Sequence, residues 1–270
     1  MSEDIKRKPP EANEAIADST EWDLFATKDG SLTLRHPEYD ELFHSDSGAL
    51  SEARGLYLQA SGITERSWSS EPLRILDIGL GLGYNALSAL EWALQRGQSI
   101  QLVSLEKDLK VFNALSDPKA EFKKNWPIEW QQHISQLQPK SQSCFIANFK
   151  SKKSSEDKEV EIEWTVCLGD ALMSTSESCS EFAAYMRKSS FDYFWQDAFS
   201  PKKNPQLWST QWFKQLRALA KLEAVLMTYS VSRVVKDALA EAGWSYELIP
   251  TCTGKRNWLR VNITTSNSPS

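Results

Sequence analysis

The feature that most constrains this chain is a short apolar segment that runs directly into three alternating glycines. Residues 74–78, Arg-Ile-Leu-Asp-Ile, have the composition of a buried strand, and residues 86–94 have that of a helix. Gly79, Gly81 and Gly83 lie between them and allow a sharp turn in which the backbone passes close to a ligand. Because backbone N–H groups are free at a helix N-terminus, such a turn suits a nucleotide-like ligand.

The spacing of these glycines narrows the class of ligand. The dinucleotide fingerprint is G-x-G-x-x-G, whereas here Tyr84 directly follows Gly83 and the pattern is G-x-G-x-G. This spacing argues against a NAD-binding oxidoreductase and fits a ligand without a pyrophosphate, of which S-adenosylmethionine (SAM) is the common one. A tight turn that binds no ligand fits the motif equally well when the motif is taken alone, so other segments must decide.

Composition and charge exclude several other classes of protein. The chain has 270 residues, of which 41% are hydrophobic and 25% charged, so it is long enough for one large α/β domain. It has no apolar run long enough for a membrane span, and its charged N-terminus lacks the apolar core of a secretory signal. Four scattered cysteines and three histidines argue against a metal site and favour the reducing cytoplasm. The net charge of −5 means that any contact with nucleic acid must rest on local basic clusters.

The order of the predicted elements indicates an α/β fold. Strands are predicted at residues 31–35, 74–78, 100–108, 191–199, 224–230, 244–249 and 257–264. Helices are predicted at residues 49–61, 86–94, 206–220 and 232–242, and helix with loop at 109–140. Residues 143–149 and 159–166 predict an inserted β-hairpin with a charged tip between its arms. This alternation predicts a mostly parallel twisted sheet with helices on both faces.

The same elements predict how the chain is divided. Residues 1–20 are polar and are predicted to form a disordered tail, and residues 265–270 a second polar tail. Residues 21–72 are expected to form an N-terminal extension that packs on the active site. Residues 73–264 are expected to form the ligand-binding domain, a SAM-dependent methyltransferase domain if the glycine turn binds SAM.

Polar residues follow several predicted strands at the ends where ligands bind in such sheets. Glu106 comes 23 positions after Gly83, where an acid typically binds ribose hydroxyls. Asp170, after the second arm of the hairpin, can accept a hydrogen bond from an adenine amino group. Asp197 ends the aromatic strand at 191–199. Four strand ends that converge on one rim favour a SAM-dependent methyltransferase of the Rossmann-like class over a structural α/β domain.

The residues after the aromatic strand indicate transfer to an amine. An amine that attacks the methyl group of SAM needs a free, aimed lone pair, and a carboxylate can orient it and accept its proton. Asp197 is the candidate for this role, and Phe199 can shape the pocket, since aromatic faces tolerate a developing cation. The competing interpretation is that Asp197 only caps the following turn.

These segments resemble a known family. Residues 191–208, Phe-Asp-Tyr-Phe-Trp-Gln-Asp-Ala-Phe-Ser-Pro-Lys-Lys-Asn-Pro-Gln-Leu-Trp, closely resemble the signature of the methyltransferase module of the bacterial tRNA 5-methylaminomethyl-2-thiouridine biosynthesis protein family. That module also occurs as a standalone enzyme. The resemblance spans about residues 30–262. Further similar segments are residues 40–52, 77–85, 105–107, 168–170 and 253–256.

The resemblance implies methyl transfer from SAM to the amine of 5-aminomethyl-(2-thio)uridine at the tRNA wobble position, in the cytoplasm. Asp197 would be the catalytic residue, and no metal is implied. The residues implied to bind SAM are Asp77, Gly79, Gly81, Gly83, Asn85, Glu106, Lys107 and Asp170. The residues implied to bind the substrate are His44, Glu52, Phe199, Lys202, Lys203, Lys255 and Arg256, the last four as contacts to tRNA phosphates. A separate enzyme would supply the aminomethyl group, because the chain has no room for the family's flavin-dependent oxidase module.

The chain departs from the family pattern at the glycine turn. Asp77 replaces the usual Glu, and Leu80 and Leu82 replace the usual Phe and Thr. The tail also lacks the Gly-Phe-Gly that usually precedes its Lys-Arg pair. These departures and the acidic net charge leave open a SAM-dependent N-methyltransferase that acts on a small-molecule or protein amine. A non-catalytic tRNA-binding module would have no chemical need for Asp197.

Overall fold

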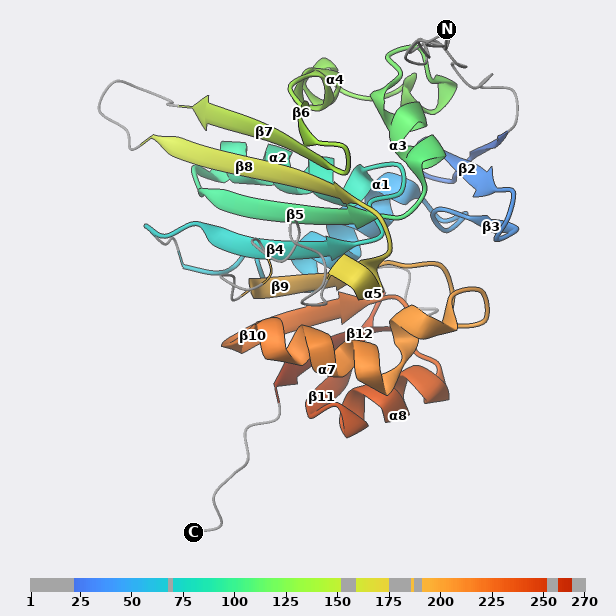
Figure 1. The fold of residues 1–270 in the computed structure, drawn as a ribbon, viewed down its shortest axis with the longest axis vertical. Helices are drawn as coiled ribbons and strands as arrows, with labels where there is room; N and C mark the ends of the chain where they lie inside the picture. The colour runs from blue at the N-terminus through green and yellow to red at the C-terminus, as the bar shows by residue number, and fades with distance from the viewer. Residues whose placement is uncertain are drawn as a thin grey trace, which may run out of the picture.

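A computed structural model describes residues 22–67, 70–151, 159–174, 186, 191–251 and 257–263, and a nine-stranded sheet forms its centre (Figure 1). Across the sheet, the strands are β11 (Trp244–Pro250), β12 (Asn257–Ile263), β10 (Ala220–Thr228), β9 (Phe191–Gln196), β4 (Leu73–Ile78), β5 (Ile100–Glu106), β8 (Val160–Leu168), β7 (Cys144–Ser151) and β6 (Gln138–Ser141). The five strands from β10 to β8 pair in parallel, and antiparallel strands extend both edges. The predicted mostly parallel sheet is confirmed.

Helices cover both faces of the sheet, as predicted (Figure 1). On one face, α2 (Tyr84–Arg96) packs into a core that contains the fully buried Leu87 and Leu90. On the other face, α7 (Thr210–Leu219) and α8 (Arg233–Glu241) enclose a second core, to which Trp212 and Leu216 contribute. Apolar residues at helical spacing therefore hold each layer against the sheet.

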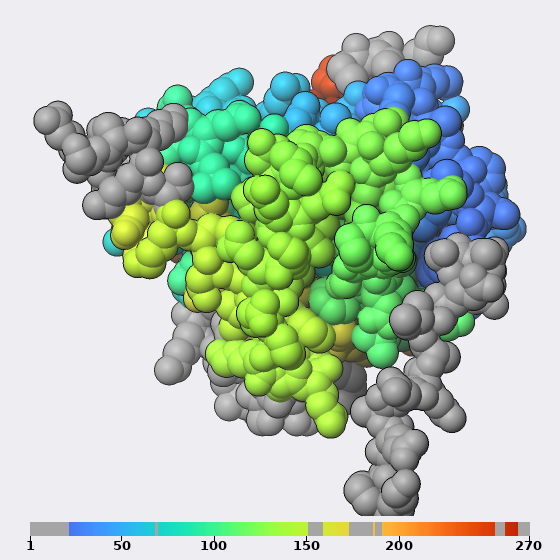
Figure 2. Space-filling view, turned by 90° about the horizontal axis from the view of Figure 1, so that it is seen from above, coloured from blue at the N-terminus to red at the C-terminus, as the bar shows by residue number. Residues whose placement is uncertain are grey.

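The N-terminal segment forms a small sheet of its own with β1 (Asp23–Ala26), β2 (Leu32–His36) and β3 (Glu41–Leu42). It lies beside α3 (Leu109–Ser116) and the 3₁₀ turn η3 (Glu121–Lys123), which Figure 2 shows in green next to the blue N-terminal residues. The Tyr84 hydroxyl donates to the Leu32 carbonyl oxygen at 2.8 Å, and the Asn125 amide donates to that of Gly30 at 3.0 Å. These bonds fix the small sheet at the rim where β4 and β5 end.

Two predictions about residues 109–166 need correction. Residues 109–140 contain α3, η3 and α4 (Ile128–Ser135), but residues 138–141 form the edge strand β6. The sequence did not predict β6, because Pro139 is typical of a strand or helix breaker and a strand tolerates proline only at the edge of a sheet. The predicted hairpin of β7 and β8 exists, yet β8 also pairs in parallel with β5 and is therefore a core strand. Residues 152–158, at the predicted tip, lie outside the described residues.

Two predicted helices are less regular than expected. Residues 49–61 begin as α1 (Ala49–Glu52) and continue as the π-helix η2 (Ala53–Gln59). Before α7, the chain forms the 3₁₀ turn η4 (Pro205–Trp208), and the Ser209 hydroxyl then accepts a hydrogen bond from the Trp212 N–H at 3.2 Å. After β8 comes the short α5 (Ala171–Ser174). Residues 1–20 and 265–270 lie outside the described residues. In the part of the chain that the structure describes, no helix is long and apolar enough to cross a membrane.

Candidate active site

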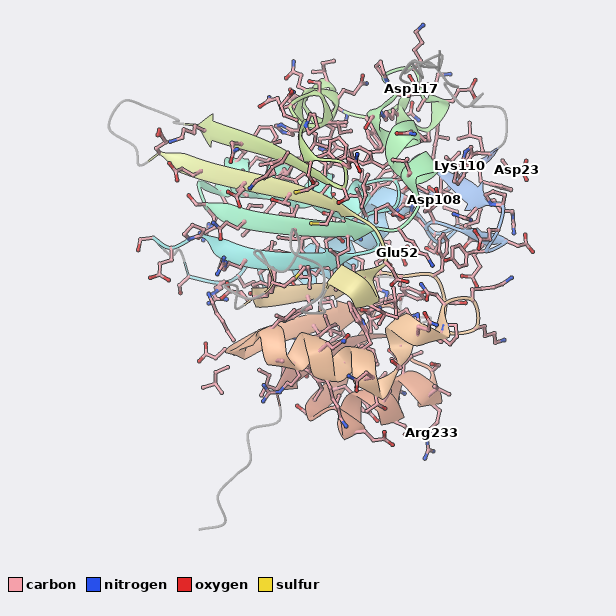
Figure 3. All side chains as sticks on the ribbon, viewed as in Figure 1. Asp23, Glu52, Asp108, Lys110, Asp117 and Arg233 are labelled. Carbon is pink, nitrogen blue, oxygen red and sulfur yellow. The ribbon has the colours of Figure 1, made fainter. Side chains whose placement is uncertain are left out.

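A cavity of about 1130 Å³ opens beyond the carboxyl ends of the parallel strands. Its walls come from the N-terminal segment, the glycine turn, the end of β5 and the loops after β8 and β9. Figure 3 shows Glu52 and Asp108 beyond the ends of β4 and β5. The predicted site residues that line the cavity are His44, Glu52, Gly79, Gly81, Glu106, Lys107, Asp170, Asp197 and Phe199. Residues far apart in the sequence therefore meet at one rim.

The glycine turn is held tightly against its neighbours. The backbone N–H groups of Gly79 and Leu80 both donate to the Leu105 carbonyl oxygen, at 3.0 and 2.9 Å. Gly79 has φ +93°, and a Cβ there would lie 2.8 Å from the Asp197 backbone oxygen. Gly81 has φ +51°, and its Cβ would lie 3.1 Å from the Phe43 ring. Both positions therefore require glycine.

Glu106 joins the end of β5 to the glycine turn. Its carboxylate accepts hydrogen bonds from the backbone N–H groups of Gly81 at 2.9 Å, Lys107 at 2.8 Å and Asp108 at 2.9 Å. Burial raises the pKa of Glu106 above its ordinary value, against these bonds, which lower it. Lys107 Nζ lies 3.9 Å from Asp170 Oδ2 across the same wall. The turn and the acid predicted to bind ribose are therefore one connected structure.

Asp77 lies beneath the turn and does not line the cavity. Trp164 Nε1 donates to Ser104 Oγ at 3.1 Å, and that hydroxyl donates to Asp77 Oδ2 at 2.8 Å. Within the described residues, Asp77 Oδ1 has no hydrogen-bond partner. Burial raises the pKa of Asp77 from 3.8 to about 7.

Ionisation of Asp77 should oppose folding. Because its pKa is higher in the folded protein than in the unfolded chain, stability is lost as the pH rises from about 4 through about 7. We expect Asp77→Asn to raise the free energy of unfolding at pH 8 by up to about 4 kcal/mol, with a smaller gain at pH 5. Urea unfolding of the SAM-free protein measures both values. The exposed Asp237→Asn is the matched control, and an equal gain at both pH values for Asp77→Asn would contradict the assignment.

Asp197 follows β9 and faces the cavity. Its backbone N–H donates to the Ile78 carbonyl oxygen at 2.9 Å, and its Oδ2 accepts from Asn85 Nδ2 at 2.7 Å. Burial and the nearby charge of Glu52 raise the pKa of Asp197 well above its ordinary value, while hydrogen bonds from Tyr57 and Asn85 lower it in part. A carboxyl group with a raised pKa, at the wall of a cavity, is suited to accept a proton.

Aromatic rings from the N-terminal segment pack on the loop that follows Asp197. Phe199 stacks on Tyr39 with ring centroids 4.5 Å apart, and it contacts the His36 and Phe43 rings, each at 5.2 Å. The Glu41 carboxylate accepts hydrogen bonds from the Ser200 hydroxyl and from its backbone N–H, the latter at 3.0 Å. The N-terminal segment thus forms one wall of the cavity and fixes the loop of β9.

The remaining predicted residues fall into three groups. His44 is buried at the cavity wall, with its ring 4.9 Å from that of Tyr84, and burial lowers its pKa to about 4. Gly83 and Asn85 lie at the start of α2, behind the wall, and the Asn85 amide is bound to Asp197. The residues predicted to bind phosphate lie elsewhere: Lys202 and Lys203 are exposed in a turn outside the cavity, and Lys255 and Arg256 fall outside the described residues.

Sequence reasoning missed the residues that hold the loop and Asp197 from the N-terminal side. These residues are His36, Tyr39, Glu41, Phe43 and Tyr57. The similarity of residues 40–52 to a family motif was a signal for Glu41 and Phe43. Tyr57 gave none, because its position in a helix with apolar spacing reads as ordinary core.

The residues at the cavity fit SAM, a cation at its sulfonium centre. Glu52 and Asp77 both raise the pKa of Asp197, and Asp77 Oδ1 and Asn85 Oδ1 are buried without a partner among the described residues. A positive ligand would offset this excess of acid groups. The glycine turn offers a backbone wall that a Cβ would obstruct, and the cavity has the volume of a small-molecule site.

Comparison with known proteins agrees with this geometry. Residues 131–263 match the family model of the S-adenosyl-L-methionine-dependent methyltransferases. The tRNA 5-methylaminomethyl-2-thiouridine biosynthesis bifunctional protein MnmC of Azoarcus sp. (strain BH72) is 30% identical over 237 residues, which are 82% of this chain and 33% of that protein. MnmC of Burkholderia pseudomallei (strain K96243) is 30% identical over 232 residues, which are 84% of this chain and 34% of that protein. The chain therefore spans about a third of the length of these relatives.

A solved structure extends the likeness to the whole fold. The crystal structure of MNMC2 from Aquifex aeolicus superposes with a TM-score of 0.68 at 25% sequence identity, covering 92% of this chain and 72% of that one. The chain belongs to the SAM-dependent methyltransferase family and is similar to the matched third of the MnmC proteins.

Proposed function

We propose that this enzyme transfers a methyl group from SAM to the amine of 5-aminomethyl-(2-thio)uridine at the wobble position of tRNA. The observation that carries the proposal is Asp197, held at the cavity wall beside the glycine turn, with a raised pKa. The name of the MnmC relatives, which refers to 5-methylaminomethyl-2-thiouridine biosynthesis, supplies the class of substrate. The product would be 5-methylaminomethyl-(2-thio)uridine.

The cavity divides into a cofactor side and an acceptor side. When bound, SAM supplies an electrophilic methyl group on a sulfonium ion. Gly79 and Gly81 would form the wall beside it, Glu106 would accept bonds from ribose hydroxyls, and Asp170 would accept one from the adenine amino group. Lys107 lies 3.9 Å from Asp170 and would help to hold that end. These are roles for groups that the structure already places at one rim.

Asp197 would act on the acceptor amine. Its carboxylate can accept a hydrogen bond from the amine, aim the lone pair and take up the proton that is lost when the new N–C bond forms. The Phe199 ring, fixed by Tyr39 and Phe43, would exclude water from that side. Glu52 lies near Asp197 and adds negative charge to the site, which favours a cationic transition state.

The macromolecular part of the substrate would bind at the cavity mouth. Lys202 and Lys203 are exposed in the turn that follows Phe199, and within the described residues neither forms an ion pair. Such cations can contact phosphates and position a tRNA without reading its sequence. They would supply local positive charge that a chain of net charge −5 needs, and Lys255 and Arg256, outside the described residues, are further candidates for phosphate contacts. A separate enzyme would supply the aminomethyl group, and the reaction would take place in the cytoplasm.

A comparison of tRNA substrates tests the proposal. We expect methyl transfer to tRNA that carries 5-aminomethyl-2-thiouridine at the wobble position, and none to the same tRNA with an unmodified wobble uridine. Radiolabelled methyl incorporation followed by nucleoside analysis measures both. Because phosphate contacts release counterions, kcat/KM should also fall steeply as salt rises. The opposite result would be methylation of free amines, unaffected by added tRNA, and no transfer to the aminomethylated tRNA. That result would favour a small-molecule or protein acceptor.

A further inference from the structure

We propose that Tyr57 is the positioning residue of Asp197, and that the π-helix η2 brings Tyr57 and Glu52 to that carboxylate together. This inference rests on the proposed role of Asp197 in methyl transfer. Tyr57 has no exposed surface, and its ring packs 5.8 Å from that of Trp195, two residues before Asp197. Its hydroxyl donates to the Gln196 carbonyl oxygen at 3.5 Å and lies beside the Asp197 side chain, where it lowers the pKa of that carboxyl. It can therefore act on the cavity only through Asp197.

The strand end that carries Asp197 is fixed from several sides. The Gln196 side chain donates to the Leu207 carbonyl oxygen at 3.0 Å and accepts from Trp212 Nε1 at 2.8 Å. Asp197 Oδ2 accepts from Asn85 of α2, and the Tyr57 hydroxyl of η2 donates to the carbonyl oxygen of the preceding residue, Gln196; neither donor lines the cavity. A carboxylate with donors behind it presents its remaining lone pairs forward. The two donors therefore aim Asp197 at the acceptor side.

The π-helix explains how one short segment supplies two groups to the same acid. Glu52 and Tyr57 are five residues apart, and in an α-helix such residues point about 140° away from each other. A π-helix closes i→i+5 hydrogen bonds, so residues five apart lie on the same face. The bond from the Ala60 N–H to the Gly55 carbonyl oxygen, at 2.9 Å, has this pattern. Figure 3 shows Glu52 at the strand ends, and Glu52 and Asp197 line the same cavity.

The two groups act on the charge of Asp197 in opposite directions. The Tyr57 hydroxyl stabilises the ionised form and lowers the pKa of Asp197, whereas the Glu52 carboxylate raises it. The other groups that face Asp197 are Asp77 in β4, which raises its pKa, and Asn85, which lowers it. Tyr229, after β10, is also close enough for Asp197 to raise its pKa. Because Tyr57 lies in the π-helix and Glu52 directly precedes it, paired substitutions in this one segment separate positioning from packing.

Two conservative variants test the inference through the pH dependence of kcat/KM. At low pH, kcat/KM should fall as Asp197 becomes protonated. Removing the hydroxyl in Tyr57→Phe should move this acid limb of the profile to higher pH by about one unit, which lowers kcat/KM about tenfold at a given pH on the limb. Removing the charge in Glu52→Gln should move the limb down. Tyr246→Phe, on the exposed face of β11, is the matched control and should leave the limb in place. The titration of the substrate amine is common to all four proteins, so the differences report on the enzyme.

A second measurement does not need an acceptor. Ionised Asp197 should favour the sulfonium of SAM, so SAM affinity measured by calorimetry between pH 5 and 9 should rise through a midpoint. We expect that midpoint to move up in Tyr57→Phe, down in Glu52→Gln, and to disappear in Asp197→Asn. If wild-type enzyme binds SAM but methylates no tRNA, the proposed function is wrong, and these midpoints still decide the role of Tyr57. Profiles of Tyr57→Phe that superimpose on those of the wild type would show that Tyr57 only packs the core.

Discussion

Asp197→Asn should lower kcat for methyl transfer by about 10² to 10⁴-fold while SAM still binds. The substitution keeps the size of the side chain and an oxygen that can accept from Asn85. In the wild type, Asn85 Nδ2 donates to Asp197 Oδ2 at 2.7 Å. It removes the lone pair that would orient the amine and accept its proton. Single-turnover methylation of aminomethylated tRNA measures the rate, and calorimetry measures SAM affinity, for which we expect a change of less than about tenfold.

The same variant should be more stable than the wild type at pH 8. The pKa of Asp197 is raised in the folded protein, so its ionisation opposes folding as the pH rises above the ordinary value of 3.8. Asn cannot ionise and removes that cost. Asp237→Asn, an exposed position on α8, controls for the loss of an acid and should change neither property. Full activity in Asp197→Asn would contradict its role, and lost activity with lower stability would indicate misfolding instead.

Much of this site could be predicted from local patterns. Gly79 and Asp170 follow strands, and Glu106 ends one, whose apolar residues are contiguous in the sequence, and the carboxyl ends of parallel strands meet at one rim. The chemistry proposed for Asp197 rests on its place after the aromatic strand β9. Each of these inferences needs only a few consecutive residues and the rule that places ligands at that end of the sheet.

The parts that escaped prediction depend on contacts between distant segments. Tyr57 and Gln196 are 139 residues apart, and apolar spacing in residues 49–61 fits an α-helix and a π-helix alike. The His36 ring reaches Asp108 across 72 residues, with Nε2 3.2 Å from Oδ2. Backbone N–H groups of Glu38 and Tyr39 point at Nδ1 of the same ring. Such pairings are set by how the N-terminal sheet docks, which no local pattern records.

The strand β6 was not predicted, for a different reason. Pro139 reads as a breaker within a predicted helix and loop, and only an edge position makes it compatible with a strand. The position of β8 in the middle of the sheet could not be predicted either, since a hairpin arm and a core strand share an apolar composition. Its register with both β5 and β7 shows that it is both. Errors of this kind concern neighbours in the sheet and leave the rim unchanged, because β8 still ends at Leu168, directly before Gly169 and Asp170.

Gly79→Ala should damage both the fold and the cofactor site. The new Cβ would lie 2.8 Å from the Asp197 backbone oxygen and 3.1 Å from its carbonyl carbon, and these atoms belong to a fixed strand end. The residue would also keep φ +93°, which side chains rarely adopt. We expect the free energy of unfolding to fall by about 2 to 5 kcal/mol, from the overpacking and the backbone strain together. SAM affinity should fall by tenfold or more, because β4 and β9 must separate where they form the cavity wall.

Gly243→Ala separates the two causes. Gly243 has φ +81°, close to that of Gly79, but a Cβ there would have no atom within 4 Å. This variant therefore bears only the cost of the left-handed backbone, about 1 to 2 kcal/mol, at a position after α8 that does not line the cavity. Urea unfolding should show the larger loss for Gly79→Ala, and calorimetry should show unchanged SAM affinity for Gly243→Ala. If both variants were equally destabilised and both bound SAM with full affinity, the glycine turn would accommodate the new Cβ without moving Asp197. The contact between Gly79 and the Asp197 backbone would then not shape the site.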